Sequence, residues 1–504
     1  MPDNFLHGVE VIEIDAGPRP IQTVRSSVIG IVGTAPNSQA EVKATLATGV
    51  VASDNALTWT SKLTGVNGNN TSVKLVDPGS NSAALAVAVA SGAITVSLAT
   101  DATGAITSTA GDVAAAVAEN ETANALVGVD DTGASDGTGV VAATRAAFLS
   151  GGIDEAFPLN TPVTVAGSRR AAAALGVAGT LPDAMDSIFD QAGAVVVVVR
   201  VEEGADDAET LANVLGGVNA ATGDYEGVHA LLGAESRLGI VPRILIAPGF
   251  THQRDGAANA TVAELIGIAE RLRAVIIADG PNTTDDAATT YAGDFGSARV
   301  YLADPWVLKV DSDGQTVQAE PSPVVAGLIA KSDNERGFWW SPSNQAVNGI
   351  VGTVRAVDFT LGDANARANL LNEQNVATFI RQDGYRLWGN RTLSDDPKFA
   401  FLSVRRTADM INDSLLRAHL WAVDRNISSN YLEDVTDGVN AYLRDLTRIG
   451  AILGGECWAD PTLNTPEQIS QGKVFFDFDF TPPYPAEHIT FRSQLVNDYI
   501  SEIF

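Results

Sequence analysis

The sequence predicts a multidomain protein of mixed class, α/β in its middle and α+β elsewhere, with an extended arm at each end. Three observations predict it. Strands alternate with helices after residue 158, residues 41–153 differ in composition from the rest, and both ends carry alternating apolar residues beside prolines. Alternating strands and helices are typical of a mostly parallel sheet that helices cover on both faces.

Composition limits the class of protein further. The chain has 504 residues, of which 45% are hydrophobic, enough for large cores in about three domains. Its net charge of −29 argues against nucleic-acid binding, because phosphates attract the opposite sign. The single cysteine, Cys457, excludes an internal disulfide and a cysteine-cluster metal site. With no visible secretory signal and no apolar run of membrane-spanning length, we expect folding in a cytoplasm without membrane insertion.

The N-terminal stretch HGVEVIEID predicts a short strand whose alternation changes phase. Val9 and Val11 lie on one face, and Ile12 and Ile14 lie on the other. The sequence Gly17-Pro18-Arg19-Pro20 then ends the strand. The first part of the chain is therefore expected to be an arm that leads into a core.

Residues 41–153 predict a small α+β module inserted in a loop. The segment is rich in Ala, Thr, Val, Gly, Asn and Ser, and its only aromatic residues are Trp59 and Phe148. Four short alternating strands and a helix that starts at Asp112 are expected in it. The alternative is a flexible low-complexity linker, against which the regular alternation argues.

The middle of the chain, up to residue 335, predicts an α/β domain. Its clearest strand is AVVVVVRVE at 194–202, a β-branched run typical of a strand buried on both faces. The stretch DSDGQ at 311–315 resembles the start of a calcium loop, but position 12 counted from Asp311 is Ser322 rather than Glu. We therefore expect a hairpin turn there.

The last third predicts two long helices. Apolar residues recur at steps of four and three from Val404 to Ala418, which indicates one face of a helix around 404–421. The opposite face carries both charges at the four-residue spacing of helical ion pairs, namely Arg405, Arg406, Asp409, Asp413 and Arg417. A second helix is expected at 430–450.

A strand near the C-terminus raises a packing question. Phe476, Phe478 and Phe480 alternate with aspartates, so the three rings lie on one face. Prolines stop the strand, and a further strand is expected around Ile489 and Phe491. Terminal strands expose unpaired backbone groups, which proteins normally cover, and pairing with a neighbour's sheet is one solution.

Few residue patterns point to catalysis. Gly472-Lys473 lacks the glycine-rich lead of a P-loop, and Ser236 lacks the flanking glycines of a nucleophile elbow. The five histidines show no metal-ligand pairing, and Asp285-Asp286 is interpreted as a solvated loop. We predict no catalytic, cofactor or metal site, and a protein that works by binding itself and others.

Five long stretches carry a family resemblance. They are FLHGVEVIEIDAGPRPIQTVRSSVIGIVGTAP, FPLNTPVTVAGSRR, FWWSPSNQAVNGIVG, NLLNEQNVATFIRQDGYRLWGNRTL and VFFDFDFTPPYPAEHITFRSQL. In this order they closely resemble the sheath subunits of contractile phage tails and R-type bacteriocins, over the whole chain except residues 41 to about 153. That segment resembles a module inserted in various phage structural proteins.

The resemblance implies a sheath core built from the N- and C-terminal parts, a middle α/β domain and the inserted α+β module. The implied boundaries are 1–40 for the N-terminal arm and start of the core, 41–153 for an outer inserted module, 154–335 for the middle domain, 336–472 for the C-terminal core and 473–504 for a strand-donating arm.

The resemblance also implies a structural role without catalytic site or cofactor. Such subunits form hexameric rings, stacked as a helical polymer around a tail tube in a metastable extended state. They contract to drive the tube through the host envelope during genome delivery. The implied partners are other copies of the chain and the tube, baseplate and tail terminator proteins, in a virion tail that is assembled in the host cytoplasm.

Two kinds of contact residue follow from the resemblance. Both arms are implied to add strands to sheets of neighbouring subunits, through Val9, Val11, Ile12, Ile14, Phe476, Phe478, Phe480, Ile489 and Phe491. A C-terminal helix is implied to contact the tube, and the helix around 404–421 is the candidate, with Arg405, Arg406 and Arg417 facing an acidic tube. The alternative for these arginines is an ordinary solvated face with four-residue ion pairs.

Other functions stay open at this point. The same subunit could serve an R-type bacteriocin or another contractile injection system. A cytoplasmic α/β enzyme is a further alternative, because loops such as APGFTHQRDG at 247–256 follow strands where ligands commonly bind. A receptor-binding protein would show a projecting repeat region, which the sequence lacks. Oligomeric state separates a sheath protein from an enzyme, since a sheath forms open tubes and an enzyme forms a closed small oligomer.

Overall fold

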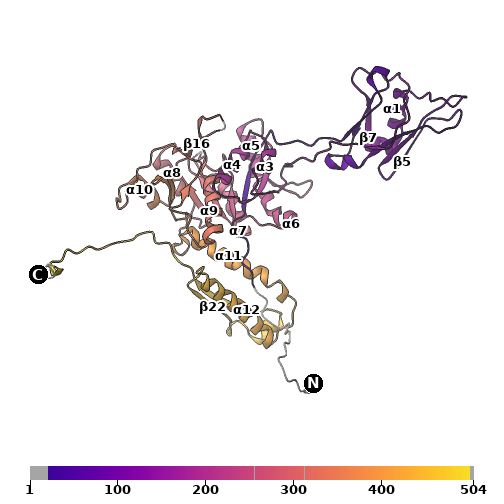
Figure 1. Ribbon diagram of the computed structural model, residues 1–504. Coiled ribbons are helices and arrows are strands. Elements are labelled where there is room, and N and C mark those ends of the chain that lie inside the picture. Colours follow the sequence, from indigo (N-terminus) through magenta and orange to yellow (C-terminus); the bar gives the residue numbers. More distant parts are fainter. Residues whose placement is uncertain (1–20, 255, 312, 500–504) are drawn as a thin grey trace, which may run out of the picture. The chain divides into compact units, whose positions relative to one another are not determined.

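The computed structural model describes residues 21–254, 256–311 and 313–499 (Figure 1). These residues form two compact units. The inserted unit comprises Asn37–Pro158 and Ala174–Gly176, and the main unit comprises the rest of the described chain.

A nine-stranded sheet forms the centre of the main unit, with its inner strands parallel and its edge strands antiparallel. The inner strands are mostly apolar and buried, as expected for a sheet covered on both faces. In spatial order the strands are β18 (Ala346–Val347), β21 (Tyr385–Trp388), β20 (Val376–Arg381), β15 (Val300–Ala303), β14 (Val275–Asp279), β13 (Ile244–Ile246), β1 (Ile29–Thr34), β10 (Val195–Val201) and β9 (Val163–Ala166). The mostly parallel sheet predicted from the sequence is confirmed.

Helices pack on this sheet from both faces. Val197 and Val199 belong to a core shared with α5 and α7, while Val196 and Val198 are buried on the opposite face. There α4 and α9 pack on each other and on the sheet, and α9 is buried along most of its length. The helices of this part are α3 (Arg169–Ala172), α4 (Leu181–Gln191), α5 (Asp207–Leu215), α6 (Ala234–Leu238), α7 (Ala260–Leu272), α8 (Asp285–Ala292), α9 (Pro321–Arg336) and α10 (Arg367–Glu373).

The sheet draws on distant parts of the chain. Its strand β1 comes from the predicted N-terminal segment, and β20 and β21 lie beyond the boundary predicted at residue 335. Hydrophobic pattern shows that a segment is a strand but not which sheet it joins, so this boundary could not be placed from the sequence.

Smaller β elements complete the main unit. The hairpin of β16 (Val307–Val310) and β17 (Thr316–Ala319) confirms the turn predicted at 311–315. In that turn the Asp311 carboxylate accepts hydrogen bonds from the backbone N–H groups of Asp313 and Gln315. The remaining short strands are β11 (Gly217–Val218), β12 (Tyr225–Glu226) and β19 (Gly352–Thr353).

We call residues 402–481 the C-terminal subdomain. Apolar faces of its two long helices pack together with the hairpin β22-β23, and Leu443 and Ile411 are fully buried between them. Its elements are α11 (Leu402–Ala418), α12 (Ser429–Arg448), β22 (Gly454–Ala459), α13 (Pro466–Ser470) and β23 (Phe476–Thr481). The two helices and the Phe/Asp strand are those that the sequence predicts.

The inserted unit contains two small sheets and two helices around the buried Trp59. Its single predicted helix is in fact two. The first helix starts after Thr109, whose side chain accepts a hydrogen bond from the Asp112 N–H, while the Asp112 carboxylate accepts one from the Thr109 N–H. Asn120 caps the second helix. Its elements are β2 (Thr45–Thr48), β3 (Leu57–Ser61), β4 (Ser72–Val76), β5 (Ala86–Ala90), β6 (Ala93–Ser97), α1 (Ala110–Glu119), α2 (Glu121–Leu126), β7 (Val127–Asp131) and β8 (Ala147–Phe148).

Candidate functional site

The Phe/Asp strand β23 pairs with a strand of its own chain. It runs antiparallel to β22, with Cys457 opposite Phe478 and Ala459 opposite Phe476. The rings of Phe476, Phe478 and Phe480 are half-buried against α11 and α12. The chain's own helices thus cover these rings in part, and their place in a sheet shared between subunits stays a prediction.

The outer edge of β23 is open in the described part of the chain. The sheet contains β22 and β23 alone, and no other described strand pairs with it. At the outer edge of β22, the Asn440 side chain donates to the Cys457 carbonyl and accepts from the Cys457 N–H. Alternate residues of an antiparallel strand turn their backbone groups away from the partner, so β23 offers such groups along its free edge.

The C-terminal segment after β23 is extended and mostly exposed. Residues 482–499 form no strand, although a strand was expected around Ile489 and Phe491. These two side chains are 67% and 93% exposed, and Leu495 is exposed as well. A strand needs a partner for its backbone groups, and the described residues supply none to this segment.

The N-terminal arm joins the C-terminal subdomain at its root. Ile21 and Val24 pack on the core of α11 and α12, and the Val24 N–H donates to Ser414 Oγ at 3.1 Å. Thr23 Oγ1 lies 3.0 Å from the Tyr442 hydroxyl. The candidate exchange residues Val9, Val11, Ile12 and Ile14 lie outside the described residues.

The arginines predicted to face a tube are engaged within the chain. Arg406 is 3% exposed and forms a two-bond ion pair with Asp333 of α9. Arg405 is largely buried between Asp409 and the ring of Phe399. These two residues therefore do not form an exposed basic face, because Asp333 of α9 covers Arg406, and Asp409 and Phe399, which are close in sequence, cover Arg405.

Arg417 is the exception, since its side chain is 40% exposed. It pairs with Asp413 at 2.7 Å and with Glu235 of α6 at 2.5 Å. The four-residue pairs Arg405–Asp409 and Arg417–Asp413 are both present, but Asp409 and Asp413 are buried, so this is not the solvated face of the alternative interpretation.

Helix α11 lies along the edge of the sheet at which the parallel strands begin. Arg299 precedes β15 and pairs with Asp409 at 2.8 Å, and Arg243 precedes β13 and pairs with Asp413. Burial lowers the pKa of Arg243, and the nearby Asp413 carboxylate opposes that effect. These buried pairs fix the C-terminal subdomain to the sheet, and the sequence did not reveal them because the arginines lie more than a hundred residues from α11.

The opposite edge of the sheet, where the alternative enzyme site was expected, is packed with side chains. Thr251, from the loop 247–256, donates to the fully buried Asp279, and Ser322 at the start of α9 donates to it from both N–H and hydroxyl. Burial, together with the nearby Glu320, raises the pKa of Asp279 to about 7. This carboxyl group holds the first turn of α9 against the sheet.

Polar clusters elsewhere are also structural. Asp285 lies in the first turn of α8 rather than in a loop, and it pairs with Arg355 and Arg367. Among the described residues, no cluster of three or more His, Cys, Asp or Glu side chains could hold a metal ion. No helix in the described part of the chain is both long enough and apolar enough to cross a membrane.

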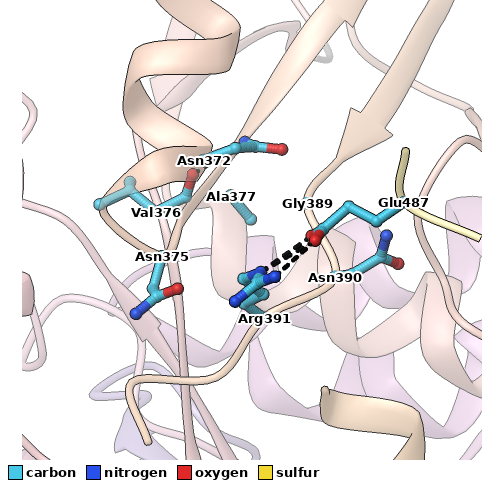
Figure 2. A pocket seen from close by; sticks show the side chains of 8 residues that line it. All are labelled: Asn372, Asn375, Val376, Ala377, Gly389, Asn390, Arg391 and Glu487. Atoms are coloured by element: carbon cyan, nitrogen blue, oxygen red, sulfur yellow. Dashed lines mark hydrogen bonds and ion pairs between the residues drawn. The ribbon is translucent and has the colours of Figure 1, made fainter. Parts of the chain in front are cut away.

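The root of the C-terminal arm contacts the main unit at Arg391 (Figure 2). Both oxygens of Glu487 lie within 3.1 Å of the Arg391 guanidinium. The Tyr484 ring lies 6.1 Å from that of Phe401, edge to face. The chain therefore leaves the body at a defined place after β23.

An α/β body, a hairpin with an open edge and an exposed apolar arm are the features expected of a structural subunit that assembles through its chain ends. Three family descriptions match the chain. They are "Phage tail sheath protein central domain" at 219–393, "Phage tail sheath C-terminal domain" at 394–496 and "Tail sheath protein Gp18 domain III N-terminal region" at 138–201.

Relatives and solved structures agree with these matches. A protein of Pseudomonas aeruginosa strain UCBPP-PA14, named as a prophage major tail sheath protein, is 46% identical over 68% of this chain and 88% of its own length. The tail sheath protein of Burkholderia phage BcepMu is 30% identical over 99% of this chain and 98% of its own. The contracted helical sheath of the anti-feeding prophage is 24% identical, with a TM-score of 0.51 over 66% of this chain and 88% of that one.

The chain therefore belongs to the phage tail sheath protein family. This is a family of structural proteins, and the enzyme alternative is set aside on that ground. The resemblance that the sequence stretches suggested is confirmed.

Proposed function

We propose that this chain polymerises as stacked hexameric rings around a tail tube in a metastable extended state. The polymer then contracts and drives the tube through the host envelope during genome delivery. Membership of the tail sheath family is the observation that carries this proposal. The similar fold of a sheath solved in its contracted state supports it. The energy for contraction comes from the difference between two packings of the same chains.

Strand exchange connects the subunits in this proposal. The C-terminal arm, with Ile489 and Phe491, adds a strand to the free edge of β23 in a neighbour, and the N-terminal arm adds another through its apolar residues. The open edge of β23 and the exposed side chains of the arm support this. Each ladder hydrogen bond contributes about 0.5–1.5 kcal/mol and each newly buried Phe or Ile about 1.5–3 kcal/mol, so one strand is a strong tether.

Contact with the tube is proposed for the exposed end of α11. Of the three arginine candidates, Arg417 has the most accessible guanidinium, and Leu416 and Leu420 beside it are strongly exposed. Arg405 and Arg406 belong instead to the joint between the C-terminal subdomain and the sheet.

The proposed partners are other copies of the chain, a tail tube protein, and baseplate and tail terminator proteins. The proposed location is the virion tail, assembled in the host cytoplasm. A bacteriocin or another contractile injection system would use the same subunit without delivering a genome. Electron microscopy of particles purified from the cells that make the protein distinguishes these cases, because a phage tail is attached to a DNA-filled head and a bacteriocin is not.

Electron microscopy of the purified chain tests the proposal. The full chain should form wide, ridged hollow tubes, and a chain that ends after Glu487 should form none. This cut keeps β23, which the monomer needs for its own core, and removes only the exposed arm. Leu361→Ser is the control, because Leu361 is 81% exposed in a loop of the main unit and should leave the tubes intact. Closed small oligomers of the full chain, at any concentration and with tube protein added, would contradict the proposal.

A further inference from the structure

A stiff segment connects the C-terminal subdomain to the body of the main unit. After β23 ends at Thr481, the chain continues as Pro482-Pro483-Tyr484-Pro485. Each proline fixes its own φ angle, and successive prolines favour an extended, semi-rigid backbone. Pro482 is buried, and Pro483 and Pro485 are half-buried, so this segment runs along the surface rather than away from it.

Two contacts hold the far end of this segment. Glu487 accepts hydrogen bonds from Arg391 Nε at 3.0 and 3.1 Å and from Nη2 at 2.6 Å (Figure 2). Tyr484 meets the edge of the Phe401 ring, and the Arg391 guanidinium lies 5.1 Å from the centre of the same ring. An isolated β-bridge between Arg391 and Phe401 places the two side chains beside each other.

A crevice borders the ion pair of Arg391 and Glu487. The crevice beside the pair is lined by Asn372, Asn375, Val376, Ala377, Gly389 and Asn390. The hydrogen bonds that Arg391 donates to Glu487 raise the pKa of Arg391.

The contacts are of a kind that can be broken. Arg391 and Glu487 are each more than a third exposed, and half-exposed ion pairs are weak and screened by salt. Their release frees the chain from Tyr484 to Glu487 in addition to the arm beyond them. A longer free arm can point in more directions, so its effective concentration at the free edge of a neighbour's β23 is lower.

We propose that Glu487 with Arg391, and Tyr484 with Phe401, form a releasable latch that fixes the root of the C-terminal arm to its own subunit. The free arm then starts at His488 and leaves the body in one direction, ready to pair with a neighbour. This role rests on the strand exchange proposed above.

A spin label on the arm tests whether the latch exists. Thr490→Cys accepts the label selectively, because Cys457 is buried and its pKa is raised to about 11. Arg391→Glu and Glu487→Gln should each increase label mobility, and the exchange Arg391→Glu with Glu487→Arg should restore it. Arg448→Glu is the control, because it breaks an exposed ion pair with Asp445 elsewhere in the main unit. Equal mobility in all these chains would overturn the latch.

Polymerisation tests what the latch does. Glu487→Gln should raise the critical concentration for tube formation about two- to fivefold, the range of one half-exposed ion pair, and the charge exchange should restore it. An unchanged critical concentration in a chain with a mobile label would overturn this role. A wild-type chain that forms no tubes would contradict the proposed function instead, and the mobility measurement would still decide whether the latch exists.

Discussion

Arg406 and Asp333 form a buried ion pair that joins α11 to α9. Both side chains are almost inaccessible to water, and Arg406 also donates to the Ser26 carbonyl in the root of the N-terminal arm. Each charge depends on the other, since a buried charge without a partner is strongly unfavourable. A basic residue that the sequence assigned to a tube-facing surface is therefore a structural residue of the monomer.

The first prediction concerns this pair. Arg406→Met should lower the free energy of unfolding by about 3–5 kcal/mol, because it leaves the Asp333 carboxylate buried and unpaired. Arg448→Met removes a similar pair in which Arg448 is 73% exposed, and should change stability by less than about 0.5 kcal/mol. Urea unfolding of the monomer measures both variants, and equal effects would contradict the account of Arg406.

The second prediction concerns Asp279 and pH. Its pKa of about 7 in the folded chain exceeds the ordinary value of 3.8, so between these values the folded state holds a proton that the unfolded state releases. The unfolding free energy should therefore fall as pH rises from about 4 to about 7, and level off above that range. Glu320 contributes in the same direction, so the comparison with Asp279→Asn isolates the part due to Asp279. Urea titrations across this range should show a shallower slope for Asp279→Asn, and parallel curves would contradict the assignment.

At the scale of elements, the hairpin β22-β23 and the arm after it have opposite roles. Phe478 lies on the helical core of its own chain, whereas Phe491 is exposed on the arm. The same residue type therefore serves the monomer at one position and, in the proposed function, the polymer at the other. The difference follows from pairing, since β23 has β22 as a partner and the arm has no partner strand among the described residues.

The third prediction separates these roles. Phe478→Ala should lower monomer stability by about 1–3 kcal/mol, because a half-buried ring is removed from the core. Phe491→Ala should leave monomer stability unchanged and raise the critical concentration for tube formation. Thermal unfolding and sedimentation of the polymer measure the two effects, and a loss of monomer stability in Phe491→Ala would contradict this division.

Sequence patterns predicted most elements of the main unit but not their partners. The helix at Leu402–Ala418 and the strand at Val195–Val201 were predicted from periodicity and β-branched composition, which are local properties. The burial of Arg405 and Arg406 was not, because a helical pattern does not show what covers its polar face. The contact of Glu487 with Arg391 joins residues almost a hundred positions apart, so no local signal marks it.

At the scale of the whole molecule, the proposed function assigns the contacts of the polymer to the main unit. Both arms, the hairpin and the sheet belong to it, and the inserted unit is a separate compact body. The match to the sheath protein of phage BcepMu covers 99% of the chain and so includes the inserted unit. The Pseudomonas relative matches 68% of this chain over 88% of its own length, so a sheath protein of this family is shorter than this chain.

The fourth prediction is that the inserted unit is dispensable for polymerisation. Val42 and Ile153 exchange backbone hydrogen bonds at 2.8 and 2.9 Å, so the two ends of the insertion lie side by side. A short glycine linker can join residues 41 and 154 without disturbing the main unit. The shortened chain should form tubes at a similar concentration, as judged by electron microscopy. A soluble, folded product that forms no tubes would show that the inserted unit takes part in assembly.

The most direct test of the central claim is a disulfide between different chains in the polymer. Phe476, Phe478 and Phe480 face the helices, so Asp479 lies on the opposite face of the hairpin. In the proposed strand exchange Ile489 and Phe491 pack beside these rings, which places Thr490 on the same face as Asp479. Chains with Asp479→Cys are mixed with chains that carry a cysteine at position 488, 490 or 492, then polymerised and oxidised. We predict a mixed disulfide from at least one position in tubes and none in the unpolymerised mixture. Tubes that form without any mixed disulfide would contradict strand exchange at the edge of β23.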